Sequence, residues 1–278
     1  MVAIVFMVAG MSSRFGGKPK QFAQVGPNNE TLIEYSVQQA LTQPFSALYF
    51  ICNPKTEIEF RKRFGNIYQG RQVHYIYQMY DIITRTKPWG TIDAIAQLYK
   101  PYYTQRTRPK EESYLIVNGD DIYGEETFRN GYNKFTHTHT PNNINFIGTI
   151  PLSQTIPKEG NVNRGVIWTS SEDLVTKMEE KMNISANTID EFKDMCANVN
   201  FIGLQTTTLK DIYEAVEHFK LDQLGNPNST TIECLLPDIV TFLIKEKDLK
   251  LEILKITNPI YGITNPEDEE TLRNILSK

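Results

Sequence analysis

The chain opens on a near-continuous apolar run, VAIVFMVA (residues 2–9), which leads directly into a turn rich in glycine, serine and basic residues. Such a run is typical of a central strand in a parallel sheet, because both faces of that strand are covered by other elements. A chain that begins this way must supply helices to cover its first strand. The opening therefore favours an α/β architecture.

Helical patterns separate further apolar, β-branched and aromatic runs, which predict strands at 47–52, 73–78 and 113–121. Thr31 and Glu34 form a capping box that predicts a helix start, and a second helix is expected at 90–100. After residue 144 four strands follow without long helices, and later elements are expected at about 208–220, 229–247, 249–256 and 266 onward. We therefore expect a Rossmann-like α/β fold, a mostly parallel mixed sheet with helices on both faces.

Composition narrows the kind of protein. The 278 residues carry a net charge of −4, so no overall positive field favours nucleic acid. The three cysteines are far apart and odd in number, which favours free thiols in a reducing compartment. The apolar start lacks a basic segment and is too short to span a bilayer. We expect a cytoplasmic protein without a membrane partner, built as one domain, with mobile surface loops at 79–89 and 153–163.

In open α/β sheets ligands bind beyond the carboxyl ends of the strands. The first strand ends in MVAGMSSRFGGKPKQF (7–22), where small residues allow close approach to a ligand and Arg14, Lys18 and Lys20 add charged donors. The spacing matches neither a Walker A loop nor a dinucleotide fingerprint. A phosphate cradle and a plain surface turn both remain open on these residues alone.

Polar residues also follow the third strand. Gln78 stands at its end, where it is either a solvated residue or an amide suited to a nucleobase edge. The loop after it holds Arg85 and Lys87, and Gly90 and Thr91 then open a helix. That helix start is explained by capping, and it also suits an anion.

The fourth strand ends in NGDD, which places Asp120 and Asp121 directly after a buried run. One or two carboxylates together with substrate phosphates are a usual Mg²⁺ site. An Asn-Gly-Asp turn accounts for Asn118 and Gly119 but not for the second acid. Neither the histidines nor the cysteines form a spacing that indicates a metal site or a nucleophile with a base.

The order of these motifs resembles that of the sugar-1-phosphate nucleotidyltransferases, or nucleoside-diphosphate-sugar pyrophosphorylases. VAGMSSRFGGKPK is similar to their signature L-A-A-G-x-G-[ST]-R-x-x-x-x-P-K. Later blocks of that family fall, in order, on YIYQ, PWGTIDAI, VNGDDIYG, GVIWTSSEDLVTKMEEK, NVNFIGL, ECLLPDIV and GITNPED. The resemblance covers nearly the whole chain.

The resemblance implies transfer of a nucleotidyl group from a nucleoside triphosphate to a sugar 1-phosphate, with Mg²⁺ as cofactor and release of pyrophosphate. It implies one domain, 1–278, with a nucleotide-binding half at 1–125 and a sugar-phosphate half at 126–278. The catalytic residues it implies are Arg14, Lys20 and Asp120, and the Mg²⁺ ligand is Asp120, with Asp121 as a further candidate. The nucleotide would be bound by Ala9, Gly10, Met11, Ser12, Ser13, Gln78, Gly90 and Thr91, and the sugar phosphate by Gly165, Glu180, Lys181 and Asn200.

Two positions depart from the pattern of the family. Ser12 replaces the usual central glycine of the loop, and Gly262 stands where the family has its second metal-binding aspartate. Asp121 or Asp268 could supply the missing carboxylate, or the substrates could complete the coordination.

Several functions stay open on the sequence. Gln78 favours UTP or dTTP, because an amide pairs with the imide edge of uracil and thymine. The acceptor could be another phosphomonoester such as phosphocholine or a phosphorylated polyol. A glycosyltransferase using a nucleotide sugar and a non-catalytic nucleotide-sugar binding protein are further alternatives. The oligomeric state is open, with a homo-oligomer one outcome because dimers are common.

Overall fold

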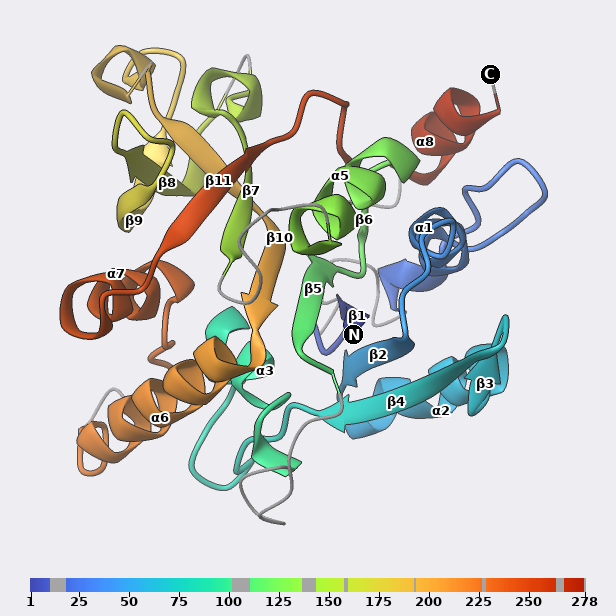
Figure 1. Cartoon of the computed structure of the whole chain (residues 1–278), viewed down its shortest axis with the longest axis horizontal. Helices are drawn as coiled ribbons and strands as arrows, with labels where there is room; N and C mark the ends of the chain where they lie inside the picture. Colours follow the sequence, from blue (N-terminus) through green and yellow to red (C-terminus); the bar gives the residue numbers. More distant parts are fainter. Residues whose placement is uncertain are drawn as a thin grey trace. The chain divides into compact units, whose positions relative to one another are not determined.

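The computed structural model describes residues 1–10, 19–101, 111–136, 144–157, 160–192, 194–226, 229–263 and 268–277. The chain divides into two compact units, each made of separate stretches of sequence. Figure 1 shows the chain coloured from its N-terminus to its C-terminus. Unit 1 takes Met1–Gln78, Lys110–His139 and Asn258–Lys278, and unit 2 takes Met79–Pro109 and Thr140–Thr257. These bounds differ from the predicted halves at 1–125 and 126–278, and which ligand each half binds stays a prediction.

Unit 1 is built on a mostly parallel sheet. Its strands lie side by side in the order β5 (Ser113–Asn118), β1 (Val2–Met7), β2 (Ala47–Cys52), β4 (Arg71–Tyr77) and β3 (Ile67–Tyr68). The first four are parallel, and β3 is antiparallel to β4. β1 is buried along almost its whole length, as its apolar run predicts. The predicted parallel strands are confirmed.

The described helices of unit 1 are α1 (Leu32–Ala40), α2 (Pro54–Phe64), α5 (Glu125–Thr136) and α8 (Asp268–Leu276). Two of them, α2 and α5, pack on the sheet through aromatic side chains. The ring of Phe50 on β2 lies 5.0 Å from that of Phe60 on α2, and the ring of Phe6 on β1 lies 6.5 Å from that of Phe128 on α5. The capping box predicted at Thr31 and Glu34 is present at the start of α1.

Unit 2 contains the mixed and antiparallel strands expected after residue 144. They are β7 (Asn145–Pro151), β8 (Val162–Thr169), β9 (Val175–Ile184), β10 (Cys196–Gln205) and β11 (Leu251–Lys255). β11 runs parallel to β7, whereas β10 is antiparallel to both β7 and β8, and β8 is antiparallel to β9. A buried cluster of Leu152, Val166, Ile184 and Ala197 packs among these elements.

The helices of unit 2 are α3 (Thr91–Ala96), α6 (Thr206–Asp222) and α7 (Leu236–Lys247). An ion pair joins the first two, because the fully buried carboxylate of Asp93 lies 2.5 Å from Lys220 Nζ. α7 begins seven residues later than the predicted 229, since the segment before it is held by contacts with residues 85–90 that are described below. No helix in the described part of the chain is long and apolar enough to cross a membrane.

Candidate active site

The carboxyl ends of the parallel strands of unit 1 lie along one edge. The pairing sets Met7 beside Asn118 and Cys52 beside Tyr77, so the residues that follow these strands meet there. This edge carries the candidate residues Ala9, Gly10, Gln78, Asp120 and Asp121. The residues Met11, Ser12, Ser13 and Arg14 lie outside the described residues, so their predicted roles stay predictions.

Lys20 and Asp120 form an ion pair, and each side chain is about three-quarters buried. The Lys20 ammonium also donates to the carbonyl oxygen of Ile263 at 3.1 Å. Lys20 begins a short 3-10 helix, Lys20–Phe22, directly after the loop predicted to cradle phosphate. The structure therefore joins two of the three predicted catalytic residues, which are 100 positions apart in the chain.

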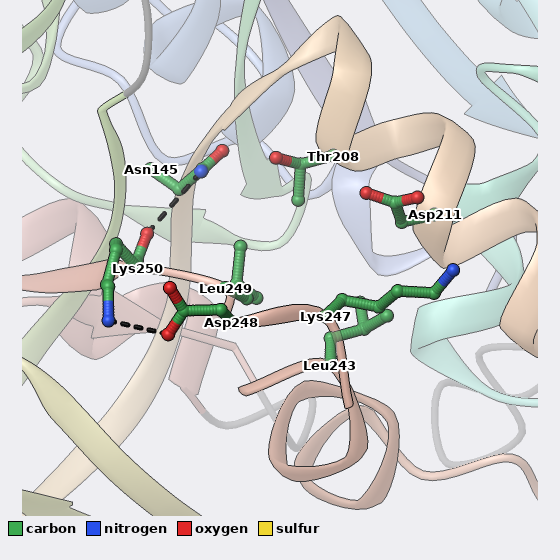
Figure 2. Close-up of a pocket in the computed structure, with 8 residues that line it drawn as sticks. All are labelled: Asn145, Thr208, Asp211, Leu243, Lys247, Asp248, Leu249 and Lys250. Carbon is green, nitrogen blue, oxygen red and sulfur yellow. Dashed lines mark hydrogen bonds and ion pairs between the residues drawn. The ribbon is translucent and has the colours of Figure 1, made fainter. Parts of the chain in front are cut away.

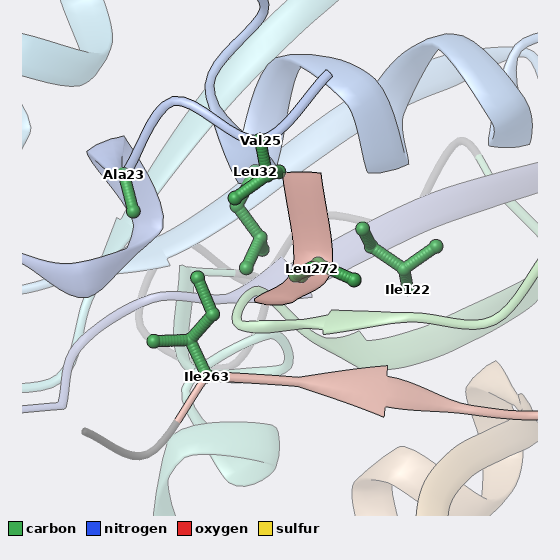
Figure 3. Packing of buried hydrophobic residues seen from close by; sticks show 6 residues of the cluster. All are labelled: Ala23, Val25, Leu32, Ile122, Ile263 and Leu272. Carbon is green, nitrogen blue, oxygen red and sulfur yellow. The ribbon is translucent and has the colours of Figure 1, made fainter. Parts of the chain in front are cut away.

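A small apolar cluster explains how these segments come together. Figure 3 shows it, and its members are Ala23, Val25, Leu32, Ile122, Ile263 and Leu272. Ala23 follows the helical turn that carries Lys20, and Ile122 follows Asp121. Burial of these apolar side chains, worth roughly 1.5–3 kcal/mol for each large one, fixes the segments that bear the charged residues.

Asp121 lies directly across a two-stranded bridge from Gly262. The bridge joins β6 (Asp121–Ile122) to β12 (Tyr261–Gly262), and a Cβ built on Gly262 would lie only 2.4 Å from Asp121 Oδ1. Asn118 Nδ2 donates to Asp121 Oδ2 at 2.8 Å. Thus the Asp121 carboxylate fills the space that a side chain at position 262 would enter.

Burial, followed by the negative charge of Asp120, raises the pKa of Asp121 to about 7. Hydrogen bonding from Asn118 and the charge of Lys20 act in the opposite direction. Two adjacent carboxylates that repel each other are an arrangement that a bound cation stabilises. Among the described residues no three His, Cys, Asp or Glu side chains gather as a metal-binding group. The carboxylate oxygens of Asp120 and Asp121 are donors of the kind that Mg²⁺ prefers.

Gln78 follows β4 directly and is 6% exposed. Its backbone N–H donates to the carbonyl of Cys52 at 3.0 Å, which continues the pairing of β2 and β4 by one residue. Gly10 is exposed, and a Cβ there would meet no atom of the described residues within 4 Å. Packing among the described residues therefore does not require glycine at position 10, whereas close approach of a ligand would.

In unit 2, Gly90 is the residue before α3 and has a φ of 102°, which favours glycine. A Cβ there would lie 2.7 Å from the carbonyl oxygen of Cys234, and the N–H of Cys234 donates to the carbonyl of Trp89 at 2.8 Å. Thr91 is exposed at the first position of the helix. The close backbone contact explains Gly90 without a ligand and also fixes where the helix begins.

The loop at 79–89, expected to be a mobile surface loop, is instead anchored by Arg85. This side chain is 5% exposed, its guanidinium lies 3.4 Å from the centre of the Trp89 ring, and it donates to the carbonyls of Ser229 and Ile232. Ile82 and Ile83 in the same loop are more than 80% exposed. Thr86 is exposed as well, so the loop lies at the surface as predicted, but Arg85 fixes it to the segment 229–232.

The structure brings three of the four predicted sugar-phosphate residues to one region of unit 2. Gly165 on β8 pairs with Glu180 on β9, and a Cβ on Gly165 would lie 3.5 Å from the Cβ of Asn198, two residues before Asn200. Burial, with the charges of Asp238 and Glu233, raises the pKa of Glu180, while Arg164 opposes the shift.

Lys181 is not brought to this region. Successive residues of a strand point to opposite faces, and Lys181 forms an ion pair at 2.6 Å with Glu179 on the other face of β9 from Glu180.

A pocket elsewhere in unit 2 contains none of the predicted residues. Figure 2 shows the residues that line it: Asn145, Thr208, Asp211, Leu243, Lys247, Asp248, Leu249 and Lys250. Lys250 pairs with Asp248 at 2.6 Å, so acidic and basic groups are mixed here and favour no single class of ligand.

Sequence reasoning missed two features of these regions. Asn198 was not considered, although two asparagines in NVN are unusual inside a strand. Arg85 was assigned to an exposed loop, although a tryptophan four residues later offered a partner. The partners of Arg85 at 229 and 232 lie more than 140 residues away, so no local pattern could identify them.

Residues 14–191 match the family described as nucleotidyl transferase. No curated protein matches the chain.

Among solved structures, a putative glucose-1-phosphate thymidylyltransferase from Bacillus anthracis has a TM-score of 0.65 at 13% identity, covering 100% of this chain and 96% of that chain. A nucleoside-diphosphate-sugar pyrophosphorylase from Vibrio cholerae RC9 has a TM-score of 0.63 at 17% identity, covering 99% and 100%. The inositol-1-phosphate CTP transferase from T. maritima has a TM-score of 0.63 at 12% identity, covering 100% and 96%.

At these identities the likeness shows the fold, which is the nucleotide-diphospho-sugar transferase fold, a Rossmann-like α/β fold of the kind expected from the sequence. The family match covers well over half of the chain and includes every described candidate residue of unit 1 except those before residue 14. The chain therefore belongs to the nucleotidyl transferase family and is an enzyme of that kind.

Proposed function

We propose that this enzyme transfers a nucleotidyl group from UTP or dTTP to a sugar 1-phosphate, releases pyrophosphate and depends on Mg²⁺. The observation that carries the proposal is the ion pair of Lys20 and Asp120 at the carboxyl edge of the parallel sheet. A triphosphate requires positively charged hydrogen-bond donors, and its metal ion requires carboxylate ligands. Lys20 and Asp120 supply one group of each kind at that edge.

The chemistry needs no base or covalent nucleophile from the protein. The attacking oxygen of a sugar 1-phosphate is already anionic, and it displaces pyrophosphate from the α-phosphorus in line. Catalysis then consists of placing the two substrates and neutralising charge on the departing pyrophosphate. Lys20 would exchange its contact with Asp120 for a phosphate oxygen, and Arg14 would neutralise charge on the leaving group.

Asp120 and Asp121 are the residues that would hold Mg²⁺. Hard oxygen donors suit this ion, and the repulsion that raises the pKa of Asp121 would be relieved by a divalent cation. When bound, Mg²⁺ neutralises phosphate charge and polarises the phosphoryl group. Asp121 in front of Gly262 supplies a second carboxylate from the opposite strand of the bridge. A second carboxylate at this place argues against a non-catalytic binding protein, the alternative that a glycine at 262 would otherwise favour.

The acceptor would lie against Gly165, Glu180 and Asn200 of unit 2. A carboxylate accepts hydrogen bonds from sugar hydroxyls, and a glycine on the facing strand leaves room for a ring beside it. Gln78 would pair with the imide edge of uracil or thymine. These assignments rest on the resemblance and on the neighbourhood of Gly165, Glu180 and Asn198.

A second candidate acceptor is a phosphorylated polyol. The similarity to an inositol-1-phosphate CTP transferase supports it, since that chain shares the fold over nearly its whole length. The reaction class is the same, and only the acceptor and the base differ.

The test is a pyrophosphate-release screen. UTP, dTTP, CTP, ATP and GTP are each combined with a panel of hexose 1-phosphates and with inositol 1-phosphate, with Mg²⁺ and with EDTA. We expect release only when acceptor and Mg²⁺ are both present, and most rapidly with UTP or dTTP. Release with inositol 1-phosphate and CTP alone would favour the second candidate, and silence across the panel would contradict both.

A further inference from the structure

β10 is interrupted by a bulge at Asn200. Its pairing with β7 runs regularly to Asn198, opposite Thr149, and resumes at Ile202, opposite Ile147. Three residues of β10 therefore face the single residue Gly148 on β7. Asn200 has a φ of 53°, in the left-handed region that an asparagine adopts only occasionally. Bulges of this kind re-aim side chains and are common near active sites.

The side chain of Asn198 holds this bulge with two hydrogen bonds. The backbone N–H of Asn200 donates to Asn198 Oδ1 at 2.8 Å, and Asn198 Nδ2 donates to Asn200 Oδ1 at 2.8 Å. The first bond fixes the backbone of Asn200. The second turns the oxygen of its amide toward Asn198, so the nitrogen end, a hydrogen-bond donor, faces the other way.

These contacts lie beside other candidate residues for the acceptor. Asn198 lies against Gly165, and Glu180 Oε2 lies 3.7 Å from where a Cβ on Gly165 would be. Both asparagines are half-buried. A hydrogen-bonded pair of amides at this place orders the surface that the acceptor would contact.

We propose that Asn198 is a positioning residue for the acceptor substrate. It sets the left-handed backbone of Asn200 and turns the Asn200 amide so that its nitrogen donates to an oxygen of the sugar phosphate. This inference rests on the proposed function, in which Asn200 contacts the acceptor, and it adds a residue that acts only through Asn200.

The chain supplies a matched control in the same unit. Asn183 on β9 also has a left-handed backbone, with a φ of 59°, and its N–H donates to the side-chain oxygen of Asn163 on β8 at 3.0 Å. Both residues are exposed. Asn163→Ala therefore removes the same kind of bond to the same kind of backbone, away from the candidate acceptor residues.

The experiment measures KM for acceptor and for nucleotide, together with Tm, in Asn198→Ala, Asn200→Gly, the double variant and Asn163→Ala. Glycine at 200 keeps the left-handed backbone and removes the amide. We expect Asn198→Ala to raise the acceptor KM about tenfold, the scale of one lost hydrogen bond to a substrate, with nucleotide KM unchanged. When Asn198→Ala is added to Asn200→Gly, it should alter the acceptor KM less than twofold, because the Asn200 amide that Asn198 orients is already absent.

Each outcome decides. The inference is overturned if Asn198→Ala leaves the acceptor KM unchanged. It is also overturned if Asn198→Ala raises the acceptor KM equally in the wild type and in Asn200→Gly, or if Asn163→Ala raises it as much. The proposed function stands in each of these cases. A wild-type protein that releases no pyrophosphate overturns the proposed function and this assignment with it. If Asn198→Ala does not fold, Asn198→Asp replaces it, since its carboxylate still accepts from the Asn200 N–H but cannot donate to Asn200 Oδ1. The same tenfold rise in acceptor KM is expected.

Discussion

At the scale of single residues, the pairing of Asp121 with Gly262 carries the most information about the site. The resemblance places an aspartate at 262, yet a side chain there would collide with Asp121 Oδ1. In this bridge the Asp121 carboxylate occupies the space beside position 262, so only glycine fits there without a shift of Asp121.

Introducing an aspartate at 262 tests whether Asp121 occupies the space beside that position. Gly262→Asp should destabilise the protein by about 1–3 kcal/mol, because it overpacks the bridge and adds a third carboxylate. Adding Asp121→Ala to Gly262→Asp should recover most of the lost stability. Urea denaturation of the wild type, Gly262→Asp and the double variant measures the free energy of unfolding of each. Equal stability of Gly262→Asp and wild type would show that the space at 262 is not occupied by Asp121.

The cysteine thiols give a second prediction at this scale. Burial, with the charge of Glu57 at Cys52 and of Asp93 at Cys234, raises the pKa of both thiols to about 12. At pH 8 iodoacetamide should therefore modify Cys196, which is half-buried, and leave the other two unmodified until the protein is unfolded.

The same shift predicts a loss of stability at high pH. An unfolded thiol loses its proton near pH 8.5, whereas the folded thiols keep theirs to about pH 12. The folded state therefore binds more protons between these values, and its stability falls as the pH rises through them. Rapid native alkylation of Cys52 or Cys234 at pH 8 would contradict the burial of those thiols.

At the scale of elements, the sequence predicts strands better than helix starts. Apolar runs identify β1, β2, β4, β5 and the four strands from β7 to β10, and the capping box identifies α1. The helices α2 and α5 were not predicted, because each buries only three residues and the rest of its surface is polar. α7 starts late because Cys234 pairs with Trp89, a contact between segments 145 residues apart.

The bulge in β10 depends on a glycine of the neighbouring strand. A Cβ on Gly148 would lie 2.7 Å from the Cβ of the fully buried Phe201. Gly148→Ala should therefore lower the free energy of unfolding by about 1–3 kcal/mol, measured by urea denaturation. Gly10→Ala, where a Cβ meets nothing within 4 Å, is the control and should change stability little. Equal stability of the two variants would refute the packing around the bulge.

At the scale of the whole molecule, the order of motifs predicted the fold and the family, while geometry within each unit was needed for the site. Asp120 and Lys20 were predicted separately, and unit 1 joins them as an ion pair. In unit 2 Gly165 pairs with Glu180, and Asn198 is hydrogen-bonded to Asn200. Lys181 faces the other way, which residue types could not show because adjacent strand residues differ only in the face they point to.

We propose that Asp120 at the edge of the parallel sheet is required for Mg²⁺-dependent nucleotidyl transfer. The most direct measurement is kcat for pyrophosphate release with the best substrate pair in Asp120→Asn. The control is Asp173→Asn, which removes an exposed carboxylate paired with Lys255. We predict that Asp120→Asn lowers kcat by roughly a hundredfold or more while the control keeps the wild-type value. A folded Asp120→Asn protein with the wild-type kcat would show that nucleotidyl transfer does not require the Asp120 carboxylate.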